Sequence, residues 1–315
     1  MKKFFLIFFC VVFLSSCSPV SISRESYKLN TLCQITVYSY TDEKILDGAF
    51  EIIDKYERLL SKNIEVSDIY KLNHANGSFV EISSETYELL KRCIEYYKLS
   101  EGLFDITLGN ATSLWDFTGN KNTPPDAESI KQAIKNIGCE NIVLENNKAA
   151  LKNEVTIDLG GVAKGYIGDK VKEYLIENNV KSAIINLGGN VVLVGDKNND
   201  DFTVAIKDPS QKNGGLLNEK LYLKDKSIVT SGIYERYFEY NSKTYHHILD
   251  PKTGYPCESD ISGVTVIGDS SELCDAYSTI CLLYGSQKAI EFLEANNMQG
   301  IIITLSGKTI KTKGW

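Results

Sequence analysis

The stretch from Val155 to Asp169, V-T-I-D-L-G-G-V-A-K-G-Y-I-G-D, constrains the fold more than any other part of the chain. Its pattern predicts a strand that ends at Asp158, then two glycines, then a helix that runs past Lys172. A helix N-terminus presents free N–H groups and the positive end of the helix dipole, and Lys164 lies in the first turn. The stretch therefore predicts either a phosphate site or a plain strand–turn–helix corner in which Asp158 caps the helix.

Three other segments carry residues suited to the same kind of site. S-E-G-L-F-D-I-T begins at Ser100, and I-I-N-L-G-G-N begins at Ile184. The third runs from 230 to 256 and contains T-S-G-I-Y-E-R-Y-F and H-H-I-L-D-P-K-T-G-Y-P. Together with D-L-G-G-V-A-K-G-Y, this set closely resembles the ApbE family, the FAD:protein FMN transferases. The resemblance extends from about Tyr27 to about Gly285, and the block with two histidines is its most specific part.

The amino terminus is typical of a bacterial export signal. Lys2 and Lys3 form a basic region, and the apolar run over residues 4–14 is too short to span a bilayer as a stable helix. L-S-S-C, which ends at Cys17, resembles a lipobox, in which cleavage precedes a cysteine that then carries lipid. The alternative is an ordinary signal peptide with a cysteine nearby. We expect a lipid-anchored protein on the periplasmic or extracytoplasmic face of the bacterial inner membrane.

This interpretation divides the chain into a signal over residues 1–16, a short tether over 17–26 and an ApbE-like transferase domain over 27–315. Loss of the signal leaves 299 of the 315 residues, enough for one large domain or two small lobes with a sizeable core. The net charge changes from -7 to -9, and an acidic chain without a basic run is a poor candidate for binding nucleic acid. A phosphate-bearing ligand must then be held by local dipoles, a few cations or a metal ion.

Seven of the eight cysteines follow the signal, and Cys17 is one of them. The other six are scattered without a C-x-x-C pair or a histidine at zinc spacing, which argues against a zinc site. An exported protein can form disulfides between some of them, and the spacing leaves the pairing open.

Apolar periodicity predicts an α+β chain. Helices are expected over residues 45–60, 83–100, 126–137, 273–285 and 289–297, and strands over 27–40, 182–190, 202–207, 221–230 and 300–305. Residues 142–151 and 155–159 are expected to pair as strands around Asn146 and Asn147. The resemblance implies mixed β-sheets flanked by helices, in a single globular unit of two lobes.

The resemblance also implies contacts to a flavin. The segment that contains Phe104 and Asp105 lines the flavin site in this family, whereas a buried aromatic ring and a capping carboxylate are the alternative. Asp158 and Lys164 are expected to contact FAD, and Ile248 joins them as a flavin-binding residue.

One magnesium site is expected, with ligands from two separate segments of the chain. The resemblance implies that Gly161 offers its backbone carbonyl to the ion. Asp275 and Thr279 are four apart on an expected helix, so they lie on one face and offer oxygen ligands that suit Mg²⁺. An exposed aspartate above a threonine is the alternative, but D-A-Y-S-T resembles the family's metal-binding D-A-x-S-T.

The adjacent histidines His246 and His247 would point to opposite faces of a strand. Only one of them then faces a site, and the resemblance favours His247. Arg236 can hold a phosphate or carboxylate with two hydrogen bonds, although an ordinary salt bridge is the alternative.

The resemblance implies that a threonine hydroxyl of a target protein attacks the FMN-side phosphorus of FAD, that AMP leaves, and that FMN stays as a phosphoester. His247 or a carboxylate beside the metal, Asp275, would take the proton. The expected partners are FAD, Mg²⁺ and an acceptor protein of an exported or membrane redox system. Two alternatives remain: an Mg²⁺-dependent FAD pyrophosphatase that gives FMN and AMP, and a non-catalytic lipoprotein that binds FAD.

Overall fold

The computed structural model describes residues 20–117, 119, 122–208 and 215–315. The expected signal and Cys17 lie outside these ranges. Within them, none of the helices has the length and apolar character needed to cross a bilayer.

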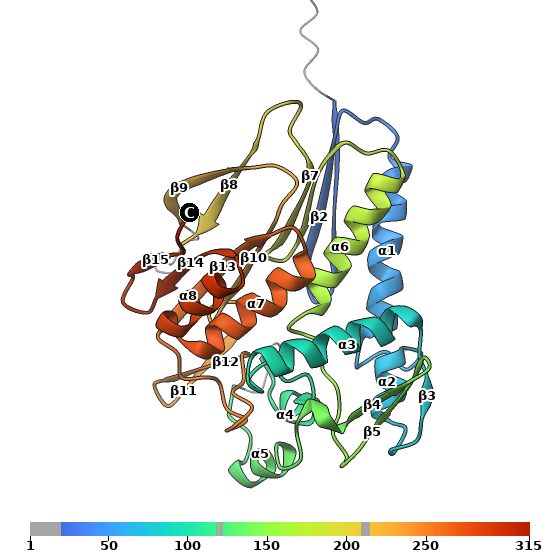
Figure 1. The fold of residues 1–315 in the computed structure, drawn as a ribbon, viewed down its shortest axis with the longest axis vertical. Helices are drawn as coiled ribbons and strands as arrows, with labels where there is room; N and C mark the ends of the chain where they lie inside the picture. Colours follow the sequence, from blue (N-terminus) through green and yellow to red (C-terminus); the bar gives the residue numbers. More distant parts are fainter. Residues whose placement is uncertain (1–19, 118, 120–121, 209–214) are drawn as a thin grey trace, which may run out of the picture.

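An eight-stranded sheet forms the centre of the fold (Figure 1). In spatial order its strands are β1 (Ser21–Lys28), β2 (Thr31–Tyr38), β6 (Ser182–Leu187), β7 (Asn190–Gly195), β10 (Ser227–Gly232), β13 (Ile261–Gly268), β14 (Gln299–Thr304) and β15 (Thr309–Lys311). All neighbouring strands of this sheet run antiparallel. The α+β class is thus confirmed.

Four helices pack beside this sheet: α1 (Lys44–Leu60), α6 (Ala163–Glu177), α7 (Ser271–Tyr284) and α8 (Ser286–Ala295). Helix α6 contacts β6 and β7, α7 contacts β10 and β13, and α8 contacts β14. Helix α1 packs on α6, and α6 packs on α7. The two helices that bear the expected metal and phosphate residues, α6 and α7, are therefore direct neighbours on the sheet.

A second group of elements lies below the sheet in Figure 1. It comprises α2 (Asp68–Asn73), α3 (Ser84–Leu99), α4 (Gly109–Leu114), α5 (Ala127–Ala133), a 3-10 turn (Cys139–Asn141), β3 (Val80–Glu81), β4 (Ile142–Glu145) and β5 (Lys148–Leu151). The strands β3, β5 and β4 form a small antiparallel sheet. Two separate hairpins, β8 (Phe202–Lys207) with β9 (Leu216–Leu223) and β11 (Tyr237–Tyr240) with β12 (Lys243–His246), complete the described fold.

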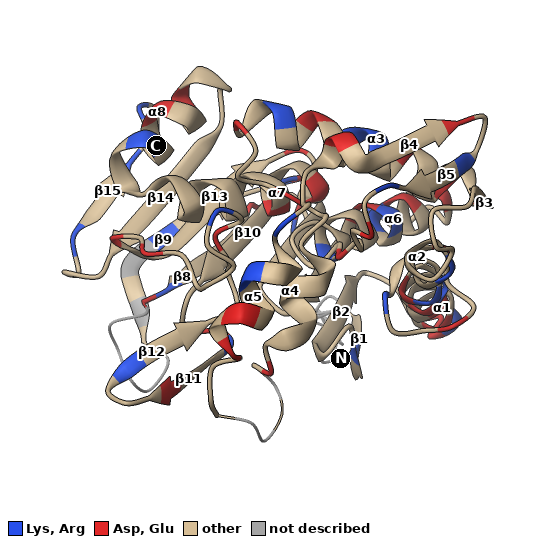
Figure 2. Cartoon of the chain, turned by 90° about the horizontal axis from the view of Figure 1, so that it is seen from below, with Lys and Arg blue, Asp and Glu red and all other residues tan. Residues whose placement is uncertain are grey.

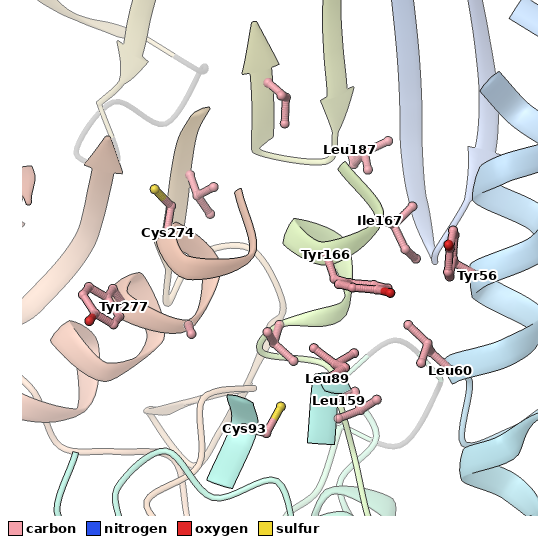
Figure 3. Packing of buried hydrophobic residues seen from close by; sticks show 14 of the residues in the cluster. Tyr56, Leu60, Leu89, Cys93, Leu159, Tyr166, Ile167, Leu187, Cys274 and Tyr277 are labelled. Atoms are coloured by element: carbon pink, nitrogen blue, oxygen red, sulfur yellow. The ribbon is translucent and has the colours of Figure 1, made fainter. Parts of the chain in front are cut away.

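The main core joins these groups around α6 (Figure 3). Tyr56 and Leu60 of α1 point toward Tyr166 and Ile167 of α6, and the two tyrosine rings meet edge to face at 5.4 Å. Leu89 of α3 belongs to the same buried cluster. Burial of apolar surface on several sides of α6 stabilises its position, by about 25 cal/mol for each Å² removed from water.

The six described cysteines are all free and buried, so the structure contains no disulfide between them. Burial raises the pKa of the Cys93 and Cys281 thiols, which keeps them protonated. Figure 2 shows that residues of both charge signs lie on α1, on α3 and on the β11–β12 hairpin.

Several predicted boundaries were wrong. Strand β1 begins at Ser21, so residues 21–26 of the expected tether belong to the sheet. The expected strand over 27–40 is two strands joined at Leu29 and Asn30, which have φ angles of 54° and 56°. The expected strand over 221–230 is likewise split, between β9 and β10. Residues 155–159 form no strand; only Thr156 makes an isolated parallel bridge, with Leu108.

Candidate active site

A cavity of about 580 Å³ lies where the sheet, α1, α6 and α7 meet the second group of elements. All nine residues that the sequence singled out as catalytic, flavin-binding or metal-binding line it: Phe104, Asp105, Asp158, Gly161, Lys164, His247, Ile248, Asp275 and Thr279. These positions come from four segments that are far apart in the chain, so the fold gathers them into one place.

The segment before α6 builds one wall of the cavity. Asp158 does not cap the helix, because the residue at the cap position is Val162, whose side chain makes no cap hydrogen bond. Instead the Gly160 N–H donates to Asp158 Oδ1 at 2.8 Å, and the Lys62 ammonium lies 2.8 Å from Asp158 Oδ2. Thr112 also donates to Oδ2, at 2.6 Å. The carboxylate thus organises the glycine turn and holds a lysine at the cavity.

The charge of Asp158 depends on this lysine. Burial raises the pKa of Asp158, but attraction to Lys62 and hydrogen bonds outweigh burial and leave the pKa below its ordinary value. Lys62 was not predicted as a site residue, because it lies just after α1 and has no spacing relation to Asp158. The only available signal was its place in the S-K-N loop next to a helix end.

Lys164 lies in the first turn of α6, as predicted. Its ammonium donates to Asn190 Oδ1 at 2.7 Å and lies 3.4 Å from Asp275 Oδ1. Asp275 Oδ2 accepts a hydrogen bond from the Gly165 N–H at 2.8 Å. The lysine and the aspartate are therefore held by the protein on the cavity wall, and each faces a partner of opposite charge.

The three expected metal ligands lie on this wall. A Cβ atom built on Gly161 would be 3.6 Å from Thr279 Oγ1 and 3.2 Å from the Phe104 ring, so the backbone of Gly161 passes close to Thr279. Asp275 and Thr279 both line the cavity from α7. Within the described ranges, no three His, Cys, Asp or Glu side chains come together to hold a metal.

The donor chemistry at this place nevertheless suits magnesium. A backbone carbonyl, a carboxylate and a hydroxyl are hard oxygen ligands, and Mg²⁺ usually takes few protein ligands and keeps several waters. The Oδ1 atom of Asp275 makes only a long contact with Lys164, which already donates to Asn190. The residues present therefore fit a magnesium ion, and their role as its ligands stays a prediction.

Phe104 is buried and packs edge to face on Tyr96 with ring centroids 5.8 Å apart. The Asp105 carboxylate accepts hydrogen bonds from the Thr107 N–H at 2.8 Å and the Thr107 hydroxyl at 2.6 Å. Burial raises the pKa of Asp105, and these bonds oppose the shift. Asp105 thus fixes the local turn, as in the alternative considered from the sequence, and no strand begins there. Its contact with a flavin stays a prediction.

The two histidines separate as predicted. His246 is buried, and its Nε2 lies 3.2 Å from the Cys257 carbonyl. His247 lines the cavity, and its Nδ1 lies 3.3 Å from the Arg236 carbonyl, which assigns the proton to Nδ1 and leaves Nε2 as an acceptor. Burial, and next the positive charge of Arg236, lower the pKa of His247 to about 4. The ring is therefore neutral near pH 7 and can accept a proton.

The turn between β10 and β11 adds two charged groups. Arg236 lines the cavity and donates a long hydrogen bond of 3.5 Å to the Asn30 carbonyl; no carboxylate in the described ranges forms a salt bridge with it. Glu235 also lines the cavity; protein surrounds its carboxyl group, but the side chain is still open to solvent. Burial raises the pKa of Glu235 to about 7, and the positive charge of Lys164 opposes this shift. Glu235 was not predicted as a site residue, although it lies within the Y-E-R of the segment that resembles the family.

Comparisons with known proteins identify the family of this chain. The sequence model of the ApbE family matches residues 29–302, and the chain therefore belongs to the ApbE family. The FAD:protein FMN transferase of Klebsiella pneumoniae is 32% identical over 86% of this chain and 85% of its own length. The enzyme of the same name from Treponema pallidum is 30% identical over 86% of this chain and 81% of its own length.

Solved structures show the same fold. The crystal structure of the ApbE protein from Thermotoga maritima superposes with a TM-score of 0.86 at 31% identity, over 93% of this chain and 97% of that one. The flavin transferase ApbE from Vibrio cholerae superposes with a TM-score of 0.83 at 22% identity, over 94% of this chain and 98% of that one.

Proposed function

We propose that this protein transfers FMN from FAD to a threonine side chain of a target protein and releases AMP. Two observations support the proposal. Relatives named FAD:protein FMN transferase match most of the chain. One cavity collects Lys62, Lys164 and Arg236, which can meet a pyrophosphate, together with the oxygen-rich wall of α6 and α7.

At phosphorus, the reaction forms one bond and breaks one. The threonine Oγ attacks the phosphorus on the FMN side of the pyrophosphate, and the bond from that phosphorus to the bridging oxygen breaks. AMP leaves with this oxygen, and the hydroxyl proton must go to a base. His247 offers Nε2 for it, because Nδ1 faces the Arg236 carbonyl and the ring is neutral.

Charge on the pyrophosphate must be neutralised as the bond breaks. Lys164 and Arg236 supply positive charge from two sides of the cavity, and Lys62 supplies it beside the glycine turn. A magnesium ion held by the Gly161 carbonyl, Asp275 and Thr279 would add further positive charge when it is bound.

The acceptor experiment tests the reaction. The purified protein is incubated with FAD and Mg²⁺, with and without an acceptor polypeptide that carries one threonine, and the acceptor is analysed by mass spectrometry. We expect FMN on the threonine-bearing acceptor and none on a version with alanine there. AMP release without an acceptor would favour the pyrophosphatase, and intact FAD in all samples would favour a binding protein.

A pair of variants tests the site. Asp275→Ala should abolish transfer, whereas Asp269→Ala should not, because Asp269 is an exposed residue that pairs with Lys226 outside the cavity. Full, magnesium-dependent transfer by Asp275→Ala would exclude the proposed metal site.

We also propose that Cys17 carries lipid and holds the protein on the extracytoplasmic face of the inner membrane, where the acceptor belongs to an exported or membrane redox system. The basic n-region, the short apolar run and the L-S-S-C sequence support this proposal. Palmitate labelling should be lost in Cys17→Ala, and labelling that persists in this variant would refute lipidation at Cys17.

A further inference from the structure

Helices α6 and α7 each provide a carboxylate that accepts hydrogen bonds from N–H groups in the first turn of the other helix. The first turn of a helix leaves N–H groups without partners inside the helix. In α6, the Gly165 N–H donates to Asp275 Oδ2 of α7 at 2.8 Å. In α7, the Ser271 and Glu272 N–H groups donate to Asp169 of α6 at 2.8 and 3.0 Å. Two carboxylates thus bind the two helices together in opposite directions.

A further N–H group in the first turn of α7 is bound by the cap residue of that helix, Ser270. The Leu273 N–H donates to the Ser270 hydroxyl oxygen at 3.2 Å, and that hydroxyl donates to Asp169 Oδ2 at 2.8 Å. Asp169 therefore receives three hydrogen bonds from the start of α7. A negative charge at this end of a helix is also favourable for the helix dipole.

The approach of the two helices depends on a glycine. A Cβ atom built on Gly165 would lie 2.7 Å from the Ser271 carbonyl carbon and 2.7 Å from Asp275 Cβ. With glycine there, the start of α7 rests directly on α6. Asp275 lies one helical turn after Ser271, so the place where α7 begins decides where the Asp275 carboxylate lies.

We propose that Asp169 is a positioning residue for the Asp275 and Thr279 side of the cavity, acting through the start of α7. Asp169 does not itself line the cavity. This inference rests on the proposed function, because it concerns the residues that we assign to the metal. Partners that orient metal ligands typically change metal affinity by about 10- to 100-fold when they are lost.

Another helix of this chain supplies the matched control. Asp260 caps α8 in the same way: the Ser286 N–H donates to Asp260 Oδ1 at 2.8 Å, and the Ser286 hydroxyl donates to Oδ2 at 2.5 Å. No residue of α8 lines the cavity. Asp169→Asn and Asp260→Asn therefore make the same chemical change at two helix starts, of which only one leads to the site.

Two measurements test the proposal: the rise in melting temperature as Mg²⁺ is added to the protein without FAD, and the Mg²⁺ dependence of FMN transfer. For Asp169→Asn we expect a half-saturating Mg²⁺ concentration about tenfold or more above wild type, with transfer at saturating Mg²⁺ largely recovered. Asp260→Asn should lower the melting temperature and leave the Mg²⁺ dependence unchanged. Ser270→Ala, a milder change, should shift the Mg²⁺ dependence in the same direction by less.

An unchanged Mg²⁺ dependence in both Asp169→Asn and Ser270→Ala would overturn the proposal. If Asp169→Asn does not fold, Ser270→Ala alone decides between the two outcomes. The melting measurement also separates this inference from the proposed function. A wild-type protein that transfers no FMN but is stabilised by Mg²⁺ would refute the transferase, and the Asp169 comparison would still be decided from the melting data.

Discussion

Gly165→Ala gives a quantitative test of how closely α6 and α7 approach. In an exposed helix, alanine in place of glycine stabilises by about 1 kcal/mol. Here the new Cβ would lie 2.7 Å from two carbon atoms of α7, about 1 Å nearer than ordinary contact between carbons. The helices must therefore move apart, since the obstructing atoms include the backbone of Ser271.

Two costs outweigh the gain in helix propensity. Overpacking of this kind costs about 1–3 kcal/mol. A shift of about 1 Å also breaks the 2.8 Å hydrogen bond from the Gly165 N–H to Asp275, a bond to a charged group that contributes about 1.5–3 kcal/mol. The net prediction, after the gain of about 1 kcal/mol in helix propensity, is a loss of about 1.5–5 kcal/mol in the free energy of unfolding.

Urea denaturation of Gly165→Ala measures this loss, and Gly168→Ala on the same helix is the control. A Cβ at Gly168 would meet only side-chain atoms, Val192 Cγ2 at 3.1 Å and Ser271 Oγ at 3.3 Å, which can give way. We expect Gly168→Ala to stay within about 1 kcal/mol of wild type. Equal stability of Gly165→Ala and wild type, with an unchanged response to Mg²⁺, would refute the close approach of the two helices.

Three further predictions concern ionisable groups of the cavity. Lys62→Met should lower the free energy of unfolding at pH 7 by about 1–2 kcal/mol. Because the pKa of Asp158 is lowered in the folded protein, the stabilisation by Lys62 is present above the unfolded pKa of Asp158. In urea titrations the difference between variant and wild type should therefore vanish as the pH falls through the pKa of Asp158 in the folded protein. Glu235→Gln should melt at a higher temperature than wild type above pH 7 and at the same temperature below pH 4. The reason is that the pKa of Glu235 is raised from 4.5 to about 7 in the folded protein, so wild type loses stability as the pH rises through this range. Melting temperatures of variant and wild type that change in parallel with pH would contradict this. His247→Ala should lower the rate of FMN transfer by about 100-fold or more and leave the FAD dissociation constant nearly unchanged, and a large loss of affinity with unchanged maximal rate would assign the ring to binding instead.

The helices could be predicted from the sequence because local signals agree with their packing. Helix α3 begins one residue after the expected start at Ser83, because the Ser83 hydroxyl accepts the Thr86 N–H and caps the helix. Helix α7 carries Asp275 and Thr279 on the cavity side, as the spacing of four predicted. The family resemblance predicted that the site residues lie close together. Apolar periodicity could not predict this, because it says nothing about contacts between segments that are distant in the chain.

The strand errors have local causes. Alternation of apolar residues continues through Leu29 and Asn30, so the turn that separates β1 from β2 was invisible to a period of two. At Ile157 the apolar pattern is that of a strand, but the partner is a side chain. The Ile157 N–H donates to Asn73 Oδ1 at 2.7 Å, and Asn73 Nδ2 donates back to the Ile157 carbonyl at 2.9 Å. An amide side chain thus takes the place of a neighbouring strand.

The contacts of Asp158 could not be read from its neighbours. The sequence left phosphate binding and helix capping open. The structure excludes capping and shows that Asp158 holds Lys62 and the Gly160 turn, and phosphate binding at this stretch stays a prediction. Pairing with a lysine that is distant in the chain is set by the packing of α1 against α6, which a local pattern does not encode.

The two sides of the cavity differ in how firmly the protein holds their polar groups. On the α6 and α7 side, Lys164 and Asp275 make bonds of 2.7 and 2.8 Å to Asn190 and Gly165 before any ligand enters. On the other side, Arg236 and His247 make only contacts of 3.5 and 3.3 Å. Preorganised charges are most effective where charge develops during a reaction, because they need no rearrangement at that moment. The firm side therefore suits the pyrophosphate, which Arg236 would meet from the looser side. His247, also on the looser side, suits the acceptor, whose hydroxyl must approach and give up its proton.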